Sequence, residues 1–141
     1  MNLRKKITSE LEAEREKNRQ NLFVKRAPFY VVAENIRSLD NVGLLFRVCE
    51  LARVKKLYLC GLTGRPAGGK NDRRPSWEIE RNDRRIRKTS IYAVPYQPWE
   101  YHRSSLALVK KLKREGVKIV VLEQTLNSIN YSKINYQDIS G

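Results

Sequence analysis

Asn41 and Arg47 are the first candidate functional residues, because they lie six positions apart where a helix is expected to begin. An asparagine side chain can cap a helix, and a guanidinium carries several hydrogen-bond donors. If Arg47 faces the crevice at the carboxyl edge of the sheet, it can meet a ligand that also touches the loop before the helix. The alternative is an ordinary helix with an Asn cap and a surface arginine.

A strand, a helix and a second strand must position this pair. FYVVA at residues 29–33 is β-rich and lacks alternation, which is typical of a strand covered on both faces in a parallel sheet. The apolar residues that follow Asn41 predict a helix to residue 52, and LYLC at residues 57–60 predicts the next strand. Ligands of such βαβ units bind beyond the carboxyl ends of the strands, so the loop at residues 34–40 is a candidate site.

Residues 61–90 are expected to form a long exposed loop, because glycines and prolines interrupt every periodic pattern. The paired basic residues of this loop point to phosphate contacts. GRPAGGK at residues 64–70 matches the spacing of a phosphate-binding P-loop, but Asn71 follows where that motif has Ser or Thr. Pro75 is also expected to prevent the regular helix that a P-loop needs. A P-loop nucleotide site is therefore not favoured.

Three further elements are expected downstream. Residues 92–101 predict a short edge segment interrupted by prolines, and SSLALVKKLKREG at residues 104–116 predicts a helix that Gly116 ends. KIVVL at residues 118–122 predicts a buried strand. Alternating strands and helices predict the α/β class: a Rossmann-like three-layer domain with a mostly parallel sheet, preceded by a charged helical arm at residues 1–28.

The residues after the last predicted strand form a second candidate site. Glu123, Gln124 and Thr125 follow that strand at the ligand-binding edge and could reach a cofactor. A plain turn at the end of a strand explains the same residues equally well.

The charge balance makes a polyanion the expected partner. The 141 residues include 29 Lys and Arg against 15 Asp and Glu, a formal net charge of +14. Nucleic acid is the first candidate, since such an excess is costly in self-repulsion unless a polyanion relieves it. A basic surface that serves solubility alone is the alternative.

The composition disfavours several other classes of protein. With one histidine, and with Cys49 and Cys60 outside any CxxC spacing, no metal site is expected and both thiols are expected to pack as small apolar groups. The longest apolar runs are far shorter than the ~20 residues of a membrane-spanning helix. The amino-terminal segment lacks the apolar core of a signal peptide, so a cytoplasmic location is expected.

Three segments of the chain resemble one known family. NIRSLDNVGLLFRVCELARVKKLYLCGLTG at residues 35–64 resembles motif 1 of the SpoU (TrmH-type) RNA 2′-O-ribose methyltransferases, in which an Asn and an Arg six apart open the first helix and "lyLcG" closes the next strand. RRIRKTSIYAVPY at residues 84–96 looks like the family's "I-x-KTALGA" segment, with Ser, Ile and Tyr where Ala, Leu and Gly are usual. LKREGVKIVVLEQTLNS at residues 112–128 resembles the next helix and strand. The resemblance covers residues 29–141.

The resemblance implies transfer of a methyl group from S-adenosylmethionine to a ribose 2′-hydroxyl of tRNA or rRNA, by a homodimer. It also implies that Arg47 activates the hydroxyl and that Asn41 orients it. A guanidinium is a poor proton acceptor, so we expect Arg47 to fix the adjacent phosphate and to neutralise the developing alkoxide. Arg37, Arg87 and Lys88 are candidate ligands of the RNA backbone, although each, judged singly, is more often a solvated charge.

Two segments of this family have no counterpart here: the glycine–asparagine–glutamate strand-loop and the final "SLN" segment, which together tie the C-terminal knot. The resemblance therefore implies an incomplete α/β-knot (SPOUT) fold, in which residues 29–141 form a C-terminally truncated methyltransferase domain. Such a fragment is expected to be inactive by itself, and its dimerisation is doubtful. The alternative function is a non-catalytic, basic RNA-binding or ribosome-associated protein.

Overall fold

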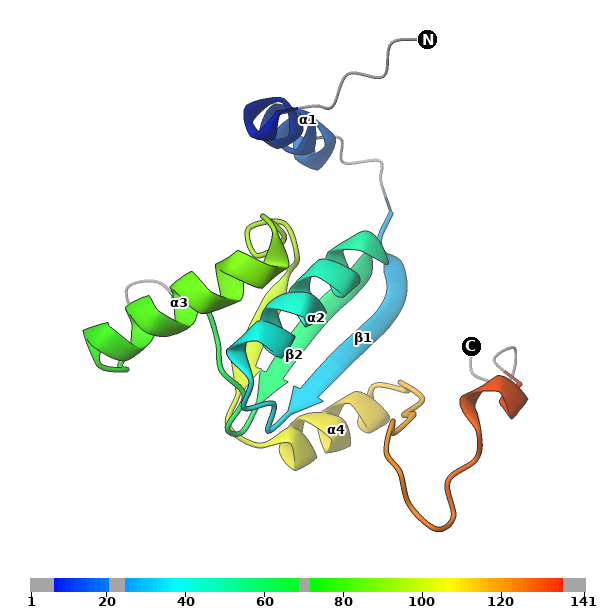
Figure 1. Ribbon diagram of the computed structural model, residues 1–141. Coiled ribbons are helices and arrows are strands. Elements are labelled where there is room, and N and C mark those ends of the chain that lie inside the picture. Colours follow the sequence, from blue (N-terminus) through cyan, green and yellow to red (C-terminus); the bar gives the residue numbers. More distant parts are fainter. Residues whose placement is uncertain (1–6, 21–24, 69–71, 136–141) are drawn as a thin grey trace, which may run out of the picture. The chain divides into compact units, whose positions relative to one another are not determined.

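The computed structural model describes residues 7–20, 25–68 and 72–135 (Figure 1). The chain divides into two compact units, Met1–Ser105 and Leu106–Gly141. In chain order the elements are α1 (Thr8–Gln20), β1 (Ala27–Glu34), α2 (Leu39–Leu51), β2 (Val54–Cys60), α3 (Ser76–Ser90), β3 (Trp99–His102), α4 (Ser105–Arg114) and a 3₁₀ turn, η1 (Tyr131–Lys133). No helix in these described ranges combines the length and the apolar character needed to cross a bilayer.

The sheet of the first unit has three parallel strands in the order β1-β2-β3. Val31 is in register with Leu57, and Leu57 with Trp99, so β2 is the central strand. This confirms the α/β class and the parallel sheet. The prediction that the first strand is covered on both faces is wrong, because Phe29 of β1 is exposed and Ala33 is the only buried residue of the strand.

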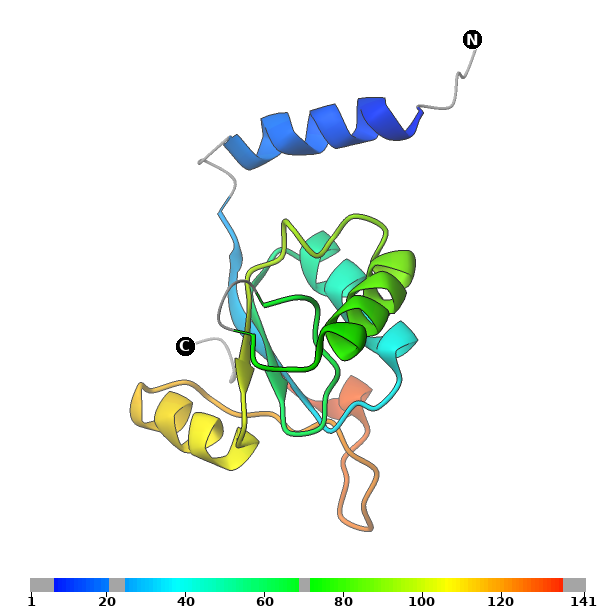
Figure 2. The same ribbon diagram turned by 90° about the vertical axis from the view of Figure 1, so that its left-hand side faces the viewer.

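The core lies between one face of this sheet and helix α2, and helix α3 packs against α2 on the same side of the sheet (Figure 2). Phe46 and Val42 of α2 pack with Leu57 and Leu59 of β2, and Ile86 adds the contribution of α3. All five side chains are fully buried. Phe46 also meets the Trp99 ring edge to face, at 6.0 Å between ring centroids. Burial of these apolar groups fixes the helices against the sheet.

Helix α2 begins earlier than its sequence predicts. Its N-cap is Ser38, whose Oγ accepts a hydrogen bond from the backbone N–H of Asn41 at 3.3 Å. The prediction that Asn41 caps the helix is therefore wrong, and Asn41 lies in the first turn. Serine and asparagine are both good capping residues, so composition alone could not choose between them.

The prediction of a loop over residues 61–90 is wrong in its second half, because Ser76–Ser90 forms helix α3. Pro75 does not prevent this helix but precedes it as the N-cap, with φ −56°. A proline at a helix start costs nothing in hydrogen bonding, since the first N–H groups have no partner within the helix. The helix was hidden from pattern analysis because two of its three buried residues, Asn82 and Ser90, are polar.

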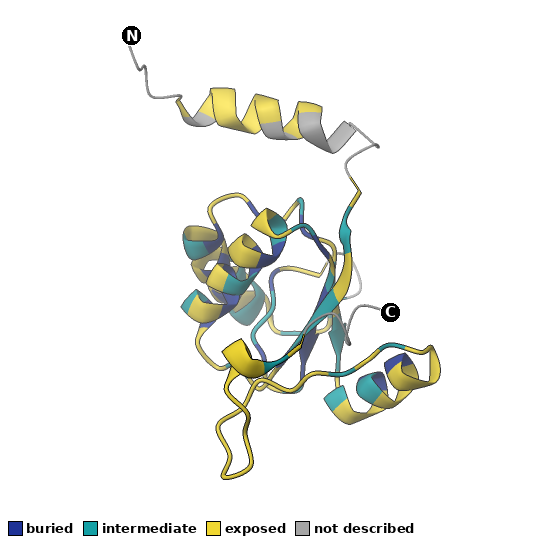
Figure 3. Cartoon of the chain, turned by 90° about the vertical axis from the view of Figure 1, so that its right-hand side faces the viewer, coloured by how far each residue is buried: buried dark blue, intermediate teal, exposed yellow. Residues whose placement is uncertain are grey.

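Downstream of α3, two predictions are confirmed and one is wrong. The edge segment appears as β3, which begins directly after Pro98, and α4 ends before Gly116, whose φ is +84°. KIVVL at residues 118–122 forms no strand, and the residues Val121 and Leu122 are 79% and 92% exposed. The segment that follows α4 is exposed over most of its length (Figure 3). A β-rich run forms a strand only when a neighbouring strand satisfies its backbone, and the described residues supply none here.

The charged amino-terminal segment is helical where it is described, over Thr8–Gln20. The predicted arm at residues 1–28 also includes residues 1–6 and 21–24, which lie outside the described part of the chain. Its expected end is two residues late, because β1 begins at Ala27.

Candidate nucleic-acid interface

A buried threonine joins the loops that follow β1 and β2 at the carboxyl edge of the sheet. The Thr63 hydroxyl donates to the carbonyl of Ala33 at 3.0 Å and accepts from the backbone N–H of Ile36 at 3.0 Å. Its exposed fraction is only 4%. Because both hydrogen bonds are made away from water, Thr63 holds the loop at residues 34–38 against the segment that follows β2.

A second contact fixes the same two loops. The Asn35 side-chain carbonyl accepts from the backbone N–H of Leu62 at 2.9 Å. Gly61 adopts φ +62°, and a Cβ there would lie 2.4 Å from the Asn35 side-chain oxygen. Only glycine fits this turn without displacing Asn35. The Tyr101 hydroxyl of β3 donates to the Gly61 carbonyl at 2.9 Å, so all three strands contribute to this edge.

An open pocket of about 530 Å³ lies at this edge. We call it the arginine pocket, because five arginines from three segments line it: Arg37, Arg65, Arg74, Arg81 and Arg85. Glu78, Thr63, Asn82 and Tyr101 contribute further polar groups to its wall. Guanidinium groups gathered over a polar wall suit a phosphate-bearing ligand.

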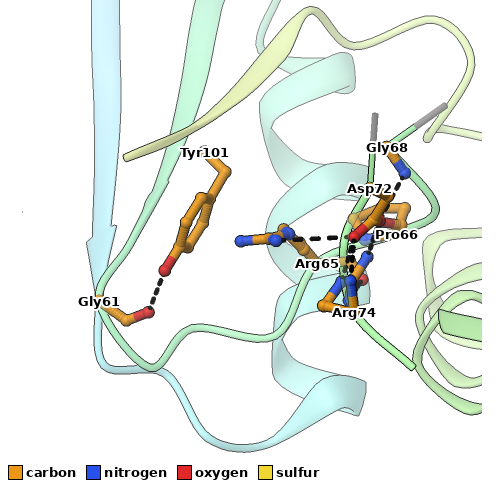
Figure 4. Close-up of polar contacts among 7 residues, drawn as sticks. All are labelled: Gly61, Arg65, Pro66, Gly68, Asp72, Arg74 and Tyr101. Atoms are coloured by element: carbon orange, nitrogen blue, oxygen red, sulfur yellow. Dashed lines mark hydrogen bonds and ion pairs between the residues drawn. The ribbon is translucent and has the colours of Figure 1, made fainter. Parts of the chain in front are cut away.

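Two of the five arginines build the pocket wall (Figure 4). Arg74 donates to the backbone carbonyls of Arg65 and Pro66 at 2.9 and 2.7 Å, and to the Asp72 carboxylate at 2.6 and 3.0 Å. The Asp72 side chain is 3% exposed. The hydrogen-bonded Arg74 guanidinium holds the pKa of Asp72 well below its usual range. Arg74 is therefore occupied in shaping the segment between β2 and α3.

Arg65 is likewise held in place. Its guanidinium carbon lies 3.8 Å from the centroid of the Tyr101 ring, and its Nη2 is 3.7 Å from Asp72 Oδ1. Stacking of a guanidinium on an aromatic face leaves its edge N–H groups able to donate.

The remaining three arginines of the pocket differ in the ion pairs and hydrogen bonds that their side chains make. Arg85 forms an ion pair with Asp40 at 2.6 Å, but both side chains are about half exposed. Among the described residues, the Arg81 guanidinium donates hydrogen bonds only to Asn82 Oδ1, at 3.4 Å from two of its nitrogens. Within the described residues, the Arg37 side chain has no ion pair or hydrogen bond. Arg37 and Arg81 are thus the cations of the pocket with most capacity for a ligand.

The structure does not bring Asn41 and Arg47 together. Six residues of α-helix separate two side chains by roughly 120° around the axis and about 9 Å along it. Neither residue is among the described residues that line the arginine pocket. Arg47 is exposed, and it shares its face of α2 with the exposed side chains of Leu44, Val48 and Leu51.

The three predicted RNA-backbone ligands lie apart. Arg37 lines the arginine pocket. Arg87 forms an ion pair with Asp83 at 2.6 Å on α3 and lines a separate depression with Tyr96 and Pro98. Lys88 is exposed on the same helix. The structure thus places only Arg37 with the other cations of the pocket.

The predicted cofactor residues form a small exposed turn in the second unit. The backbone N–H of Gln124 donates to the Glu123 carboxylate at 2.9 Å, and that of Thr125 donates to Ser128 Oγ at 2.8 Å. All four residues are exposed. A cofactor such as S-adenosylmethionine needs a concave site that covers most of its surface. These three residues, as placed here, do not provide one, and the plain-turn alternative describes them.

Most residues that line the pocket were not predicted as site residues from the sequence. Glu78, Arg81, Asn82 and Arg85 lie three or four positions apart, which places them on one helix face. The spacing of these four residues indicates a shared face only if the segment is known to be helical.

The region of the chain covered by the structure contains no cluster of three or more His, Cys, Asp or Glu that could hold a metal.

Comparison with known proteins adds no relative: no protein-family model matches the chain, and no curated protein matches it.

Proposed function

We propose that this protein is an RNA-binding methyltransferase, which transfers a methyl group from S-adenosylmethionine to a ribose 2′-hydroxyl of tRNA or rRNA. The observation that carries the proposal is the position of the arginine pocket. It lies at the carboxyl edge of a parallel sheet, where α/β proteins bind their ligands, and it adjoins the loop that opens α2. Its unpaired cations and the net charge of +14 favour a polyanionic ligand.

Contact between two of the family-like segments also supports the proposal. Thr89, of the segment that resembles "KTALGA", donates from its hydroxyl to the Asp40 carbonyl at 2.9 Å. Gly43, of the segment that resembles motif 1, lies directly opposite Thr89. Two segments 46 positions apart in sequence are thereby joined beside the pocket. This is the arrangement expected if both belong to one functional site.

In this proposal the described residues act on the RNA side of the reaction. Arg37 and Arg81 hold backbone phosphates in the arginine pocket, while Arg65 and Arg74 keep its wall in place. Arg47, exposed on the neighbouring helix α2, binds the phosphate next to the target ribose. It also neutralises the negative charge that develops on the 2′-oxygen of that ribose. We assign no step to Glu123, Gln124 or Thr125, because they form no site for the methyl donor.

We further propose that the complete methyltransferase acts as a homodimer in the cytoplasm. Leu44, Val48 and Leu51 recur at helical spacing on α2 and are all exposed. These residues share their face of α2 with Arg47, which must stay open to RNA, so the dimer proposal rests on the family resemblance and not on this stripe.

A second candidate function is RNA binding without catalysis, as in a ribosome-associated factor. Its supporting observation is that Arg47 and Asn41 stand outside the arginine pocket. The two candidates differ in one assay, transfer of labelled methyl from S-adenosylmethionine to tRNA and rRNA by the full gene product. Labelled 2′-O-methylribose in the RNA supports the enzyme. Salt-sensitive RNA binding, with neither methyl transfer nor binding of S-adenosylmethionine, supports the non-catalytic protein and contradicts the first proposal.

A further inference from the structure

We infer that Trp77 is a stacking platform for an unpaired base of an RNA strand whose phosphates occupy the arginine pocket. The inference rests on the proposed RNA binding and deepens it, because it specifies a single-stranded or locally unpaired target. Base stacking on tryptophan needs an exposed ring face beside a cationic groove that follows the backbone. The structure provides an exposed tryptophan ring and a cationic pocket at the end of α3 where that helix begins.

Among the described aromatic residues beside the pocket, Trp77 is the one that is largely exposed. It lies in the first turn of α3 and is 63% exposed. The other tryptophan, Trp99, packs into the core against Phe46. The Tyr101 ring is already covered by the Arg65 guanidinium, and its hydroxyl is bonded to Gly61. An exposed tryptophan ring beside the cations of a pocket is the combination with which proteins stack unpaired bases.

Arg81 connects Trp77 to the arginine pocket. It lies four residues after Trp77, and its guanidinium carbon is 5.3 Å from the centroid of the Trp77 ring. Arg81 also lines the pocket together with Asn82 and Arg85, its neighbours on the same helix. Trp77 therefore lies at the rim of the pocket, on the side where α3 begins.

The two residues divide the recognition of one nucleotide between them. Within the described residues, the only hydrogen bonds of the Arg81 side chain are two long ones to Asn82, so its N–H groups remain able to donate to a phosphate. The ring of Trp77 can then take a base on its open face while the cation stabilises the other. Arg37, on the loop after β1, supplies a second phosphate contact across the pocket.

This arrangement predicts selectivity for strand state rather than for sequence. Every base has a stacking face, so the platform does not distinguish among the four bases. A base within a duplex is already stacked and cannot reach the ring. A binding mode that depended on charge alone would not need Trp77 for either form of RNA.

The test measures binding of the full chain to a short single-stranded RNA and to a duplex RNA of the same length, by fluorescence anisotropy. Trp77→Ala should weaken single-strand binding by roughly 5- to 150-fold and leave duplex binding unchanged. Trp77→Phe should retain most of the affinity, because an aromatic ring remains. Arg84→Gln, an exposed arginine of the same helix outside the pocket lining, is the matched control for a general surface change.

The outcomes separate this inference from the function on which it depends. Equal single-strand affinity of wild type, Trp77→Ala and Trp77→Phe overturns the stacking platform but leaves RNA binding intact. Equal losses in both forms of RNA overturn it too, since they indicate a structural role. Absence of binding to either RNA by the wild type contradicts the proposed function itself. Quenching of tryptophan emission by the single strand, lost in Trp77→Ala, supports the platform independently.

Discussion

Gly43 of α2 and Thr89 of α3 lie so close that no side chain fits between them. A Cβ on Gly43 would be 1.9 Å from Thr89 Oγ1 and 2.5 Å from the Ile86 carbonyl oxygen. Thr89 Oγ1 also donates to the Asp40 carbonyl at 2.9 Å. The two helices are therefore in backbone contact, which places the pocket residues of α3 next to the loop that carries Arg37.

Gly43→Ala should destabilise the protein, although alanine is the better helix former by about 1 kcal/mol. The added methyl group must push α3 away from α2, and overpacking of this kind costs about 1–3 kcal/mol. Urea unfolding monitored by circular dichroism measures the change. Val48→Ala, at an exposed position of the same helix, is the control and should change stability by no more than about 0.5 kcal/mol. A Gly43→Ala variant as stable as the control would contradict the close packing.

Asp72→Asn should destabilise the protein by about 3 kcal/mol at neutral pH, because it leaves the buried Arg74 guanidinium without its charge partner. Since Arg74 depresses the pKa of Asp72, the stabilisation is fully present above the unfolded value of ~4 and is lost as pH falls further toward the folded value. The stability difference between wild type and variant should therefore shrink below about pH 4.

Chemical denaturation at a series of pH values tests this dependence. Asp40→Asn removes the partner of Arg85 in a half-exposed ion pair and should cost less than about 1 kcal/mol. A difference between wild type and Asp72→Asn that stays constant into strong acid would show that the carboxylate is not held by its charge.

Cys49 and Cys60 should be inert in the native protein. Both thiols are buried, and burial raises the pKa of each to about 11. At pH 8 only about one thiol in a thousand would then be ionised, and the thiolate is the reactive form. A thiol-specific chromogenic reagent should therefore detect both cysteines in denaturant and neither on the same timescale under native conditions. Rapid native labelling of either one would contradict its burial.

Arg47→Lys should lower methyl transfer by the full gene product roughly 10- to 100-fold, because lysine keeps the charge but loses the two-pronged donor. Arg47 is exposed, so the substitution should leave the unfolding midpoint unchanged. Single-turnover methylation with labelled S-adenosylmethionine is the measurement. Full activity of the lysine variant would argue against bidentate phosphate recognition by Arg47.

The part of the fold that could be predicted is the part held by unbroken apolar runs. FYVVA and LYLC predict β1 and β2, and the broad apolar face of the segment between them predicts α2. Helix α3 could not be recognised, because it packs through the polar side chains of Asn82 and Ser90 around the single buried apolar residue Ile86. KIVVL shows the opposite error, since its apolar residues have no neighbouring strand among the described residues and remain exposed.

The candidate site was predictable only in outline. The carboxyl edge, the loop after β1 and Arg37 follow from the order of strands and helices. The other four arginines reach the pocket from residues 65–85, where the turn at Gly61 and the Asp72–Arg74 contact decide their positions. Such contacts depend on the local course of the backbone, which spacing in a sequence does not specify.

The salt dependence of single-stranded RNA binding tests the arginine pocket most directly. Affinity measured from about 50 to about 200 mM salt gives the number of phosphates neutralised, at a slope of ~0.7 per contact. The double variant Arg37→Gln, Arg81→Gln should lower the magnitude of the slope by about 1.4 and weaken binding at every salt concentration, whereas Arg84→Gln should not. An unchanged slope in the double variant would show that the RNA backbone binds elsewhere.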